Sequence, residues 1–275
     1  MGNKIAIIHH SGSGSTRTVG EIFAELLSEK HNVDLVDILP INFDFDYSSL
    51  YKYDLLIFGT PTFNCSPSRS MVEFVEKMPP LNSPKRGFLY TTYALYTGNC
   101  IRTFAKGLKE KGVITAGYTA IRGPGSDGAL FFPSFDRFFN YEKRVKEKIE
   151  RAVSEMEEII VNPAVKPKTP IFKWYVPLNY PNQYFGEKNF FKPRDRIEVL
   201  KDRCTNCSNC VKNCIRGCWA EGDDFPKFTP TNCEFCLKCI HNCPKMAIVF
   251  SEKMWDKPRL NRKFYNGMKE SILSR

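Results

Sequence analysis

Short apolar runs alternate with helical patterns over the first 160 residues of the chain. Runs rich in Val, Ile, Leu, Phe and Tyr predict buried strands at residues 4–9, 33–38, 55–59, 88–93 and 113–121. Between these runs, apolar residues recur at intervals of three and four, as they do on one face of a helix. Strands that alternate with helices favour an α/β fold with a doubly wound, five-stranded parallel sheet.

Helical patterns follow most of these runs. Three shorter patterns begin after Thr16, Pro67 and Gly98. The last pattern ends before Pro163, since proline does not continue a helix. A helix is therefore predicted over residues 135–160, with an apolar stripe formed by Val145, Ile149, Val153 and Met156.

Two polar loops follow the first and third predicted strands. The first, residues 11–16, reads Ser-Gly-Ser-Gly-Ser-Thr and leads into a helix. Its small residues let backbone N–H groups approach an anion at the helix N-terminus. The loop lacks the lysine of a Walker loop and the dinucleotide pattern, so it suits a monophosphate, with a plain turn as the alternative. In an open α/β sheet, ligands bind where the strand order reverses, so both loops are expected at one crevice.

These two loops resemble those of the flavodoxins. Residues 11–16 resemble the flavodoxin phosphate loop, and Gly59-Thr60-Pro61-Thr62-Phe63 resembles the loop around the isoalloxazine ring. The resemblance implies FMN as a cofactor and a flavodoxin-like domain over residues 1–160. It assigns the FMN phosphate to Ser11, Ser13, Gly14, Ser15 and Thr16, and the flavin border to Thr60, Pro61, Thr62 and Phe63.

Further residues could border the flavin. The resemblance implies an aromatic residue from the loop after the fourth strand, where Tyr93 and Tyr96 are candidates and simple packing is the alternative. The acidic residues that flavodoxins place beside this aromatic residue are absent from the sequence here. Residues 122–128 either cover the flavin or only connect two elements. Cys65 and Cys100 lie near these loops and are interpreted as structural thiols.

Eight of the eleven cysteines lie between residues 204 and 243, in two runs of the form C-x-x-C-x-x-C-x-x-x-C. Each cysteine of the first run recurs 29 residues later, so one structural unit is expected twice. Three thiolates on a tight loop can hold three corners of a [4Fe-4S] cluster, while the fourth reaches the other cluster. We therefore predict two clusters with crossed ligation: Cys204, Cys207, Cys210 with Cys243, and Cys233, Cys236, Cys239 with Cys214.

Zinc sites and a disulfide framework are the alternatives for these cysteines. Zinc takes four ligands in a structural site, which leaves the third and fourth cysteines of each run without a role. Disulfides are typical of secreted proteins, and the sequence shows no feature of secretion. Residues 198–250 resemble a bacterial two-cluster ferredoxin domain at all eight ligand positions. His241 is expected to face solvent, and Cys218 is surplus to the eight ligands.

The composition of residues 161–197 and 251–275 indicates what these two segments form. Residues 161–197 hold six prolines and many aromatic residues, which predicts a connector packed on the protein. The aromatic residues of this segment are Phe172, Trp174, Tyr175, Tyr180, Tyr184, Phe185, Phe190 and Phe191. Residues 251–275 form a basic tail in which a short helix docked by one face is predicted.

Charge and hydropathy limit the kinds of partner and the location that can be expected. The chain carries a net charge of +10, and all of the excess falls in residues 161–275. Because oxidised clusters with thiolate ligands are negative, we expect an acidic redox partner rather than nucleic acid, for which no motif is present. No run approaches the roughly 20 apolar residues that span a bilayer, and no signal peptide is evident. The sequence therefore predicts a cytoplasmic protein without a membrane span.

Together the two resemblances imply a flavodoxin–ferredoxin fusion of the kind found in anaerobes. Clusters carry single electrons, whereas a flavin accepts two. The predicted function is that of an iron-sulfur flavoprotein, a low-potential redox carrier between two [4Fe-4S] clusters and FMN. The alternative is an FMN-dependent reductase of a small-molecule oxidant. No constellation of His, Asp or Tyr indicates a proton donor, so no catalytic residue is assigned.

Overall fold

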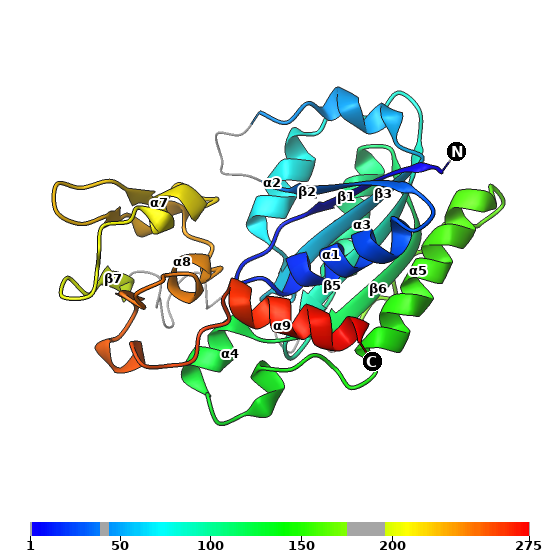
Figure 1. Ribbon diagram of the computed structural model, residues 1–275. Coiled ribbons are helices and arrows are strands. Elements are labelled where there is room, and N and C mark those ends of the chain that lie inside the picture. The colour runs from blue at the N-terminus through cyan, green and yellow to red at the C-terminus, as the bar shows by residue number, and fades with distance from the viewer. Residues whose placement is uncertain (1, 39–43, 175–195, 275) are drawn as a thin grey trace.

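A parallel sheet forms the centre of the larger part of the molecule. The computed structural model describes residues 2–38, 44–174 and 196–274. The strand order is β2-β1-β3-β5-β6, which is the flavodoxin-like order and confirms the predicted fold class (Figure 1). The strands are β1 (Lys4–His9), β2 (Asn32–Asp37), β3 (Leu55–Phe63), β5 (Lys85–Tyr93) and β6 (Val113–Arg122).

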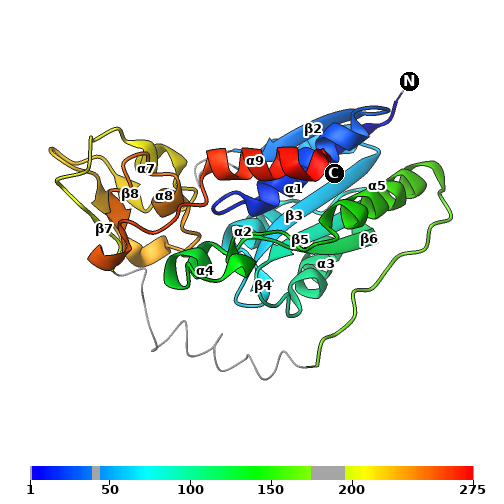
Figure 2. The same cartoon turned by 60° about the horizontal axis from the view of Figure 1, so that its bottom comes forward.

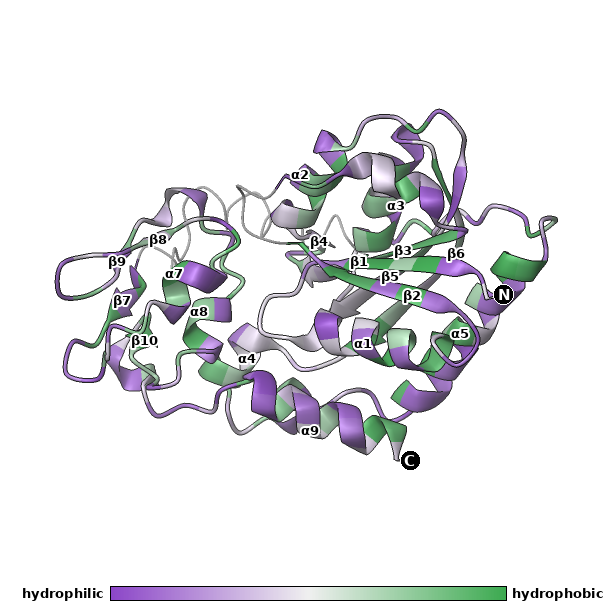
Figure 3. Cartoon of the chain, turned by 45° about the horizontal axis from the view of Figure 1, so that its top comes forward, coloured by the Kyte–Doolittle hydropathy of each residue, from purple (hydrophilic) through white to green (hydrophobic). Residues whose placement is uncertain are grey.

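Helices cover both faces of this sheet. Because strand side chains alternate between faces, Ile5 and Ile7 pack into one core while Ala6 and Ile8 pack into the other. The first core is completed by α1 (Ser15–Leu27), α5 (Val145–Val161) and α9 (Arg262–Leu273). The second is completed by α2 (Arg69–Lys77) and α3 (Cys100–Glu110). Figure 3 shows β1 and β3 as largely hydrophobic, whereas α9 carries hydrophobic and hydrophilic positions.

The third strand runs further than the sequence predicted. It continues to Phe63 because Thr60 and Pro61 still pair with β5. The chain then turns back through Asn64 and Cys65, both with left-handed backbone angles (φ 47° and 64°), into β4 (Ser66–Pro67). The expected loop after the third strand is therefore mainly a strand followed by a two-residue turn.

The predicted helix over residues 135–160 is wrong in its first third. The structure has α4 (Ser126–Phe131), a 3-10 turn at Asp136–Phe138 and then α5, which begins only at Val145. Phe138 folds back onto Gly125, whose backbone N–H donates to the Phe138 carbonyl at 3.1 Å. These contacts, together with the bond from the Glu142 N–H to the Arg122 carbonyl, override the local helical pattern.

Residues 196–260 form a small unit beside the carboxyl edge of the sheet, which we call the cysteine-rich unit (Figures 1 and 2). It contains two short helices and two antiparallel ladders, β7 with β10 and β8 with β9. The elements are β7 (Glu198–Val199), α7 (Asn209–Asn213), β8 (Trp219–Ala220), β9 (Lys227–Phe228), α8 (Lys238–His241) and β10 (Ile248–Val249). Further 3-10 turns lie at Tyr47–Lys52, Pro230–Asn232 and Glu252–Met254.

The C-terminal tail returns to the sheet. Its predicted helix is confirmed as α9, which docks by one face through the buried Tyr265 and Ile272. Arg262 Nη1 pairs with Glu21 Oε1 at 2.7 Å, and Lys269 Nζ with Glu25 Oε2 at 2.7 Å. The helix of the tail thus lies along α1, whereas residues 251–260 belong to the cysteine-rich unit (Figure 2).

The described start of the connector is tied to the sheet domain by its backbone. The Lys168 N–H donates to the Thr115 carbonyl at 2.8 Å, and Arg102 Nη1 donates to the Pro170 carbonyl at 2.8 Å. Of its aromatic rings, Phe172 and Trp174 are 55% and 75% exposed, and the Phe172 ring lies 5.8 Å from the Arg102 guanidinium. Tyr175, Tyr180, Tyr184, Phe185, Phe190 and Phe191 lie outside the described residues.

Hydropathy along the helices gives one further result. In the part of the chain that the structure describes, no helix has the length and apolar character needed to cross a membrane.

Candidate functional site

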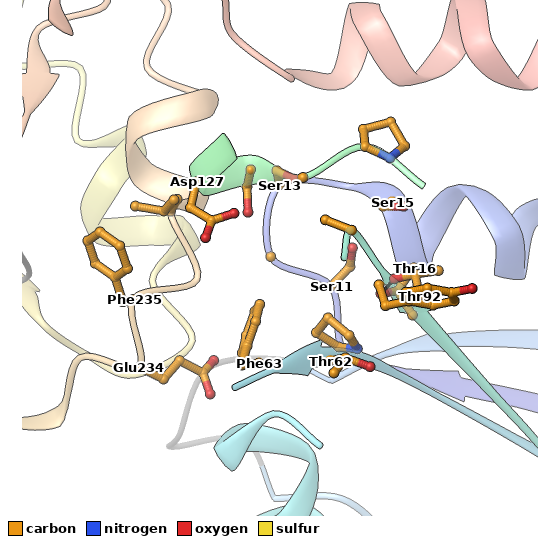
Figure 4. A pocket seen from close by; sticks show the side chains of 18 of the residues that line it. Ser11, Ser13, Ser15, Thr16, Thr62, Phe63, Thr92, Asp127, Glu234 and Phe235 are labelled. Atoms are coloured by element: carbon orange, nitrogen blue, oxygen red, sulfur yellow. Dashed lines mark hydrogen bonds between the residues drawn. The ribbon is translucent and has the colours of Figure 1, made fainter. Parts of the chain in front are cut away.

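A cleft of about 160 Å³ opens at the carboxyl edge of the sheet, where the strand order reverses between β1 and β3 (Figure 4). Most of the residues proposed for FMN meet in it. The phosphate loop, residues 11–16, forms one wall, and the end of β3 forms another. The predicted residues that line the cleft are Ser11, Ser13, Ser15, Thr16, Pro61, Thr62, Phe63 and Tyr93.

Three of the proposed residues do not line this cleft. Gly14 lies under the Tyr265 ring, and with φ at 151° it adopts a backbone conformation that favours glycine. Thr60 is fully buried, and its hydroxyl accepts the Ser68 backbone N–H at 3.1 Å. Tyr96 is 59% exposed and lines a neighbouring pocket instead.

The hydroxyl groups of the phosphate loop differ in their partners. Ser13 Oγ lies 2.9 Å from the Tyr265 hydroxyl, and Ser15 Oγ donates to the Tyr141 hydroxyl at 3.2 Å. Thr16 Oγ1 lies 2.7 Å from Thr92 Oγ1. Only the Ser11 hydroxyl is buried without a hydrogen-bond partner among the described residues of this loop. A buried, unsatisfied donor beside a helix N-terminus fits a phosphate oxygen as its partner.

The cysteine-rich unit closes the same cleft. Glu234, Phe235 and Leu237, which stand between the cysteines of the second run, line it opposite the phosphate loop (Figure 4). The two walls touch, since a Cβ placed on Gly12 would lie only 2.6 Å from the Cys236 carbonyl oxygen. Sequence reasoning missed this contact because the two segments are more than 200 residues apart and no local pattern links them.

Two carboxylates border the cleft, although the flavodoxin resemblance gave no acidic residue beside the flavin. Asp127 comes from residues 122–128, so that loop lines the cleft and does more than connect two elements. Glu234 comes from the cysteine-rich unit, and its side chain is only 4% exposed. Its two oxygens accept the Ser70 N–H at 3.0 Å and the Ser70 hydroxyl at 2.8 Å. The carboxylate therefore caps the start of α2 from across the interface.

A buried histidine completes this contact. His10 Nε2 lies 3.3 Å from Glu234 Oε1, and His10 Nδ1 lies 2.8 Å from Ser68 Oγ. Burial lowers the pKa of His10, which favours the neutral imidazole. The ring also meets Phe63 edge-on at 6.4 Å between centroids. The carboxyl end of β1 is thus joined both to the cleft and to the cysteine-rich unit.

A second ion pair joins α2 to the cysteine-rich unit. Arg216 Nη1 and Nη2 bind the two oxygens of Glu73 at 2.5 and 3.0 Å. Arg216 is only 4% exposed at its side chain, whereas Glu73 is 28% exposed and also binds Arg69. Arg216 therefore relies on Glu73 for its charge partner, whereas Glu73 keeps Arg69 and solvent when Arg216 is lost.

This asymmetry predicts unequal effects on stability. Glu73→Ala should lower the free energy of unfolding by about 3 kcal/mol, because it leaves a buried guanidinium without its partner. Arg216→Met should cost about 1 kcal/mol or less, since Glu73 keeps Arg69 and part of its solvent contact. Chemical denaturation of both variants measures the difference. Equal losses would contradict the buried role given to Arg216.

The thiols gather in two groups. Cys204, Cys207 and Cys210 of the first run line one small cavity together with Cys243, the last cysteine of the second run. This is one of the two combinations that crossed ligation requires. Among the described residues, no three His, Cys, Asp or Glu side chains are arranged to hold a single metal ion.

The second group lies nearer the sheet domain. Cys214 Sγ accepts the Cys218 backbone N–H at 3.3 Å, and Cys214, Cys218 and Cys233 belong to one apolar core, which brings the last cysteine of the first run to the second run. Cys239 belongs to the same apolar core and meets the buried Trp219 indole. Cys214, Cys233 and Cys239 are three of the four ligands predicted for the second cluster, whereas Cys218 is the surplus thiol. The full ligand set, which includes Cys236, stays a prediction.

The backbone confirms that one structural unit is used twice. Left-handed φ angles occur at Asn206, Ser208 and Gly217, and again 29 residues later in the second run. The last cysteines match as well: Cys214 Sγ accepts the Cys218 N–H at 3.3 Å, and Cys243 Sγ accepts the Ala247 N–H at 3.2 Å. The second set of left-handed residues is Phe235, Leu237 and Met246.

The expectation that His241 faces solvent is wrong. The side chain is fully buried, with Nε2 2.9 Å from the Ser126 carbonyl and Nδ1 accepting the Leu260 N–H at 3.0 Å. Nε2 is therefore the donor. Because Ser126 lines the cleft, His241 ties this wall to α8. A polar residue between two cysteines gave no sign of this tertiary contact.

Cys65 and Cys100 lie in the sheet domain, apart from the cysteines of the two runs. Cys100 is fully buried beside Thr91, and burial raises its pKa to about 11. It therefore stays a neutral thiol at physiological pH, as a structural cysteine would. Cys65 is partly buried in the turn between β3 and β4, and burial raises its pKa as well.

Comparisons with known proteins give partial similarities. No family model matches the chain. A polyferredoxin-like protein of Methanocaldococcus jannaschii, itself uncharacterised, is 35% identical over 63 residues. That match covers 23% of this chain, and the chain spans only 27% of that relative's length.

Solved structures with a similar course of the chain include flavodoxins. A Streptococcus pneumoniae flavodoxin is 18% identical and covers 57% of this chain and 99% of its own, with a TM-score of 0.43. Oxidised flavodoxin 1 from Bacillus cereus is 18% identical, with coverages of 58% and 98% and a TM-score of 0.41. Rubredoxin oxygen:oxidoreductase from Desulfovibrio gigas is 17% identical, with coverages of 57% and 36% and a TM-score of 0.39.

Proposed function

We propose that this chain is a flavodoxin–ferredoxin fusion that carries electrons between two [4Fe-4S] clusters and FMN. The proposal divides it into a flavodoxin-like domain (1–160), a connector (161–197), a two-cluster ferredoxin-like domain (198–250) and a basic tail (251–275). The tail helix α9 packs on α1 and so supports the flavodoxin-like domain.

One observation carries this proposal. The phosphate loop and the second cysteine run are two walls of one cleft, and Gly12 touches the Cys236 backbone. A cluster held by Cys233, Cys236 and Cys239 would therefore border any ligand of the cleft. Carriers that exchange electrons within one chain need such an approach, because covalent linkage alone gives only a high effective concentration.

The residues of the cleft have separate roles in this proposal. The Ser11 hydroxyl and the backbone N–H groups of the phosphate loop would hold the FMN phosphate, while Pro61, Thr62, Phe63 and Tyr93 would border the ring. FMN supplies the exchange between one-electron and two-electron steps. Tyr265 fixes Ser13, and Tyr141 fixes Ser15 by donating to its carbonyl at 3.0 Å, so the loop is preorganised.

The positions of the two cysteine groups relative to the cleft suggest the order in which electrons would pass the redox centres. The group around Cys233 lies at the cleft, whereas the group around Cys204 lies beyond it and includes Cys207, the one exposed cysteine among those described. Electrons would therefore enter near Cys207, cross to the inner cluster and reach FMN. The donor is expected to be an acidic redox protein, since the C-terminal half carries the positive excess.

Cofactor content tests the proposal. Protein purified without oxygen should hold about eight iron atoms and eight sulfides per chain, as two cubane clusters require, together with one FMN. Metal analysis, sulfide assay and flavin absorption measure these contents. Two zinc ions and no flavin would refute the proposal.

A further inference from the structure

A buried tryptophan in the cysteine-rich unit carries a hydrogen-bond donor without an acceptor. Trp219 on β8 is only 4% exposed, and its ring packs on Phe228 of β9 with centroids 5.0 Å apart. The indole Nε1–H is buried and makes no hydrogen bond within the part of the chain that the structure describes. Buried donors nearly always have a partner, so this one indicates an acceptor that is not part of the polypeptide.

The internal repeat gives the place of Trp219 relative to the cysteines. The residue that matches Trp219 in the second repeat is Ile248, which stands 29 residues later on β10. Ile248 lines the cavity of the group around Cys204, which we call the outer group. Because the two repeats share their backbone conformation, Trp219 is expected to hold the same place beside the inner group, around Cys233.

The contacts of the indole agree with this place. Trp219 shares one apolar core with Leu237, Ile240 and Cys239. Burial raises the pKa of the Cys239 thiol to about 12, and the adjacent Trp219 indole acts in the opposite direction because it stabilises the thiolate. A buried water needs two to four polar partners, which apolar neighbours do not supply. The sulfur atoms of a cluster on Cys239 are therefore the better acceptor for this N–H.

A hydrogen bond at this place would change a reduction potential. An N–H that donates to a sulfur stabilises the additional negative charge of a reduced cluster, and such bonds are among the factors that set cluster potentials. The exclusion of water around Trp219 strengthens the bond, since the local dielectric is low. Ile248 has no donor, so the matching position of the second repeat offers the outer cluster no such bond.

We propose that the Trp219 indole donates a hydrogen bond to a sulfur of the inner cluster and raises its reduction potential. The inference rests on the proposed function, which assigns that cluster to Cys239 and its three partner cysteines. Trp219 thereby makes the two clusters unequal, although their ligands come from two copies of one run. The cluster beside the cleft is the one whose reduced state this donor favours.

Trp219→Phe tests the inference in the full-length chain purified without oxygen, because phenylalanine keeps an aromatic ring and removes the N–H. A redox titration followed by electron paramagnetic resonance measures the potentials of both clusters. The equilibrium constant for one-electron reduction of one cluster should fall about tenfold, which corresponds to a potential lower by about 59 mV. The same constant of the other cluster should change less than about twofold.

Trp255→Phe is the matched control. This indole belongs to the same unit, but it is 41% exposed and stacks on the Arg203 guanidinium, 3.8 Å from the ring centroid. Its replacement should lower neither equilibrium constant by more than about twofold. A residue that only fills space would affect the free energy of unfolding and leave both potentials unchanged.

Iron content, measured in each variant first, separates the two proposals. If Trp219→Phe fails to keep about eight iron atoms, benzothienylalanine at position 219 takes its place, since it keeps the fused rings and replaces the N–H by sulfur. Unchanged potentials in the loaded variant, or an equal fall in Trp255→Phe, would overturn the inference and leave the carrier function intact. A wild-type chain that holds no clusters would overturn the proposed function, and the inference with it.

Discussion

Cys214→Ser should remove the inner iron-sulfur cluster, although Cys214 belongs to the other cysteine run. Crossed ligation makes Cys214 the fourth ligand of the cluster on Cys233, Cys236 and Cys239. The iron content should fall from about eight to about four atoms per chain. Electron paramagnetic resonance of the reduced protein should then show one cluster signal without coupling to a second.

The mirror variant and a control sharpen this test. Cys243→Ser should remove the outer cluster on Cys204, Cys207 and Cys210, and FMN should still be reducible through the inner one. Cys218→Ser should keep about eight iron atoms, because Cys218 is buried beside Cys214 but is surplus to the eight ligands. Loss of the outer cluster in Cys214→Ser would show that each run holds its own cluster.

Gly12→Ala should slow electron transfer between the inner cluster and FMN. The added methyl group would lie 2.6 Å from the Cys236 carbonyl oxygen, so the phosphate loop and the second cysteine run must move apart. Because electron transfer slows as the separation of the two centres grows, we expect a severalfold loss of rate. Flash reduction of the clusters, followed at the flavin absorption, measures the rate.

A second glycine provides the control for this substitution. Gly267 lies on α9, and a Cβ added there would have no neighbouring atom within 4 Å, so Gly267→Ala places the same methyl group in open space. It should leave the transfer rate unchanged and stabilise the helix by about 1 kcal/mol. If Gly12→Ala transferred electrons as fast as Gly267→Ala, the contact at Cys236 would have no part in the route.

Local patterns were sufficient to predict the sheet. The apolar runs of β1 and β3 are buried by helices on both faces, and such strands need no long-range information to be recognised. The repeat of the cysteine runs likewise predicted a repeated backbone, since the left-handed angle at Asn206 recurs at Phe235. Both features are set by residues close in sequence.

Features that depend on distant contacts could not be predicted. Glu234 looks like an exposed acid between cysteines, yet it caps α2 through Ser70. His241 is buried only because Ser126 and Leu260 meet it from other segments. Residues 135–144 carry a helical pattern, but Phe138 packs on Gly125 instead. In each case a tertiary contact outweighs the local preference.

The kinetics of flavin reduction in the wild-type chain test the central claim most directly. When the clusters are reduced by a flash, FMN in the same chain should be reduced with a first-order rate constant that does not change with protein concentration. Such a result is expected because both centres border one cleft. A rate constant that rises in proportion to protein concentration, or clusters that reoxidise without any change at the flavin absorption, would contradict the account.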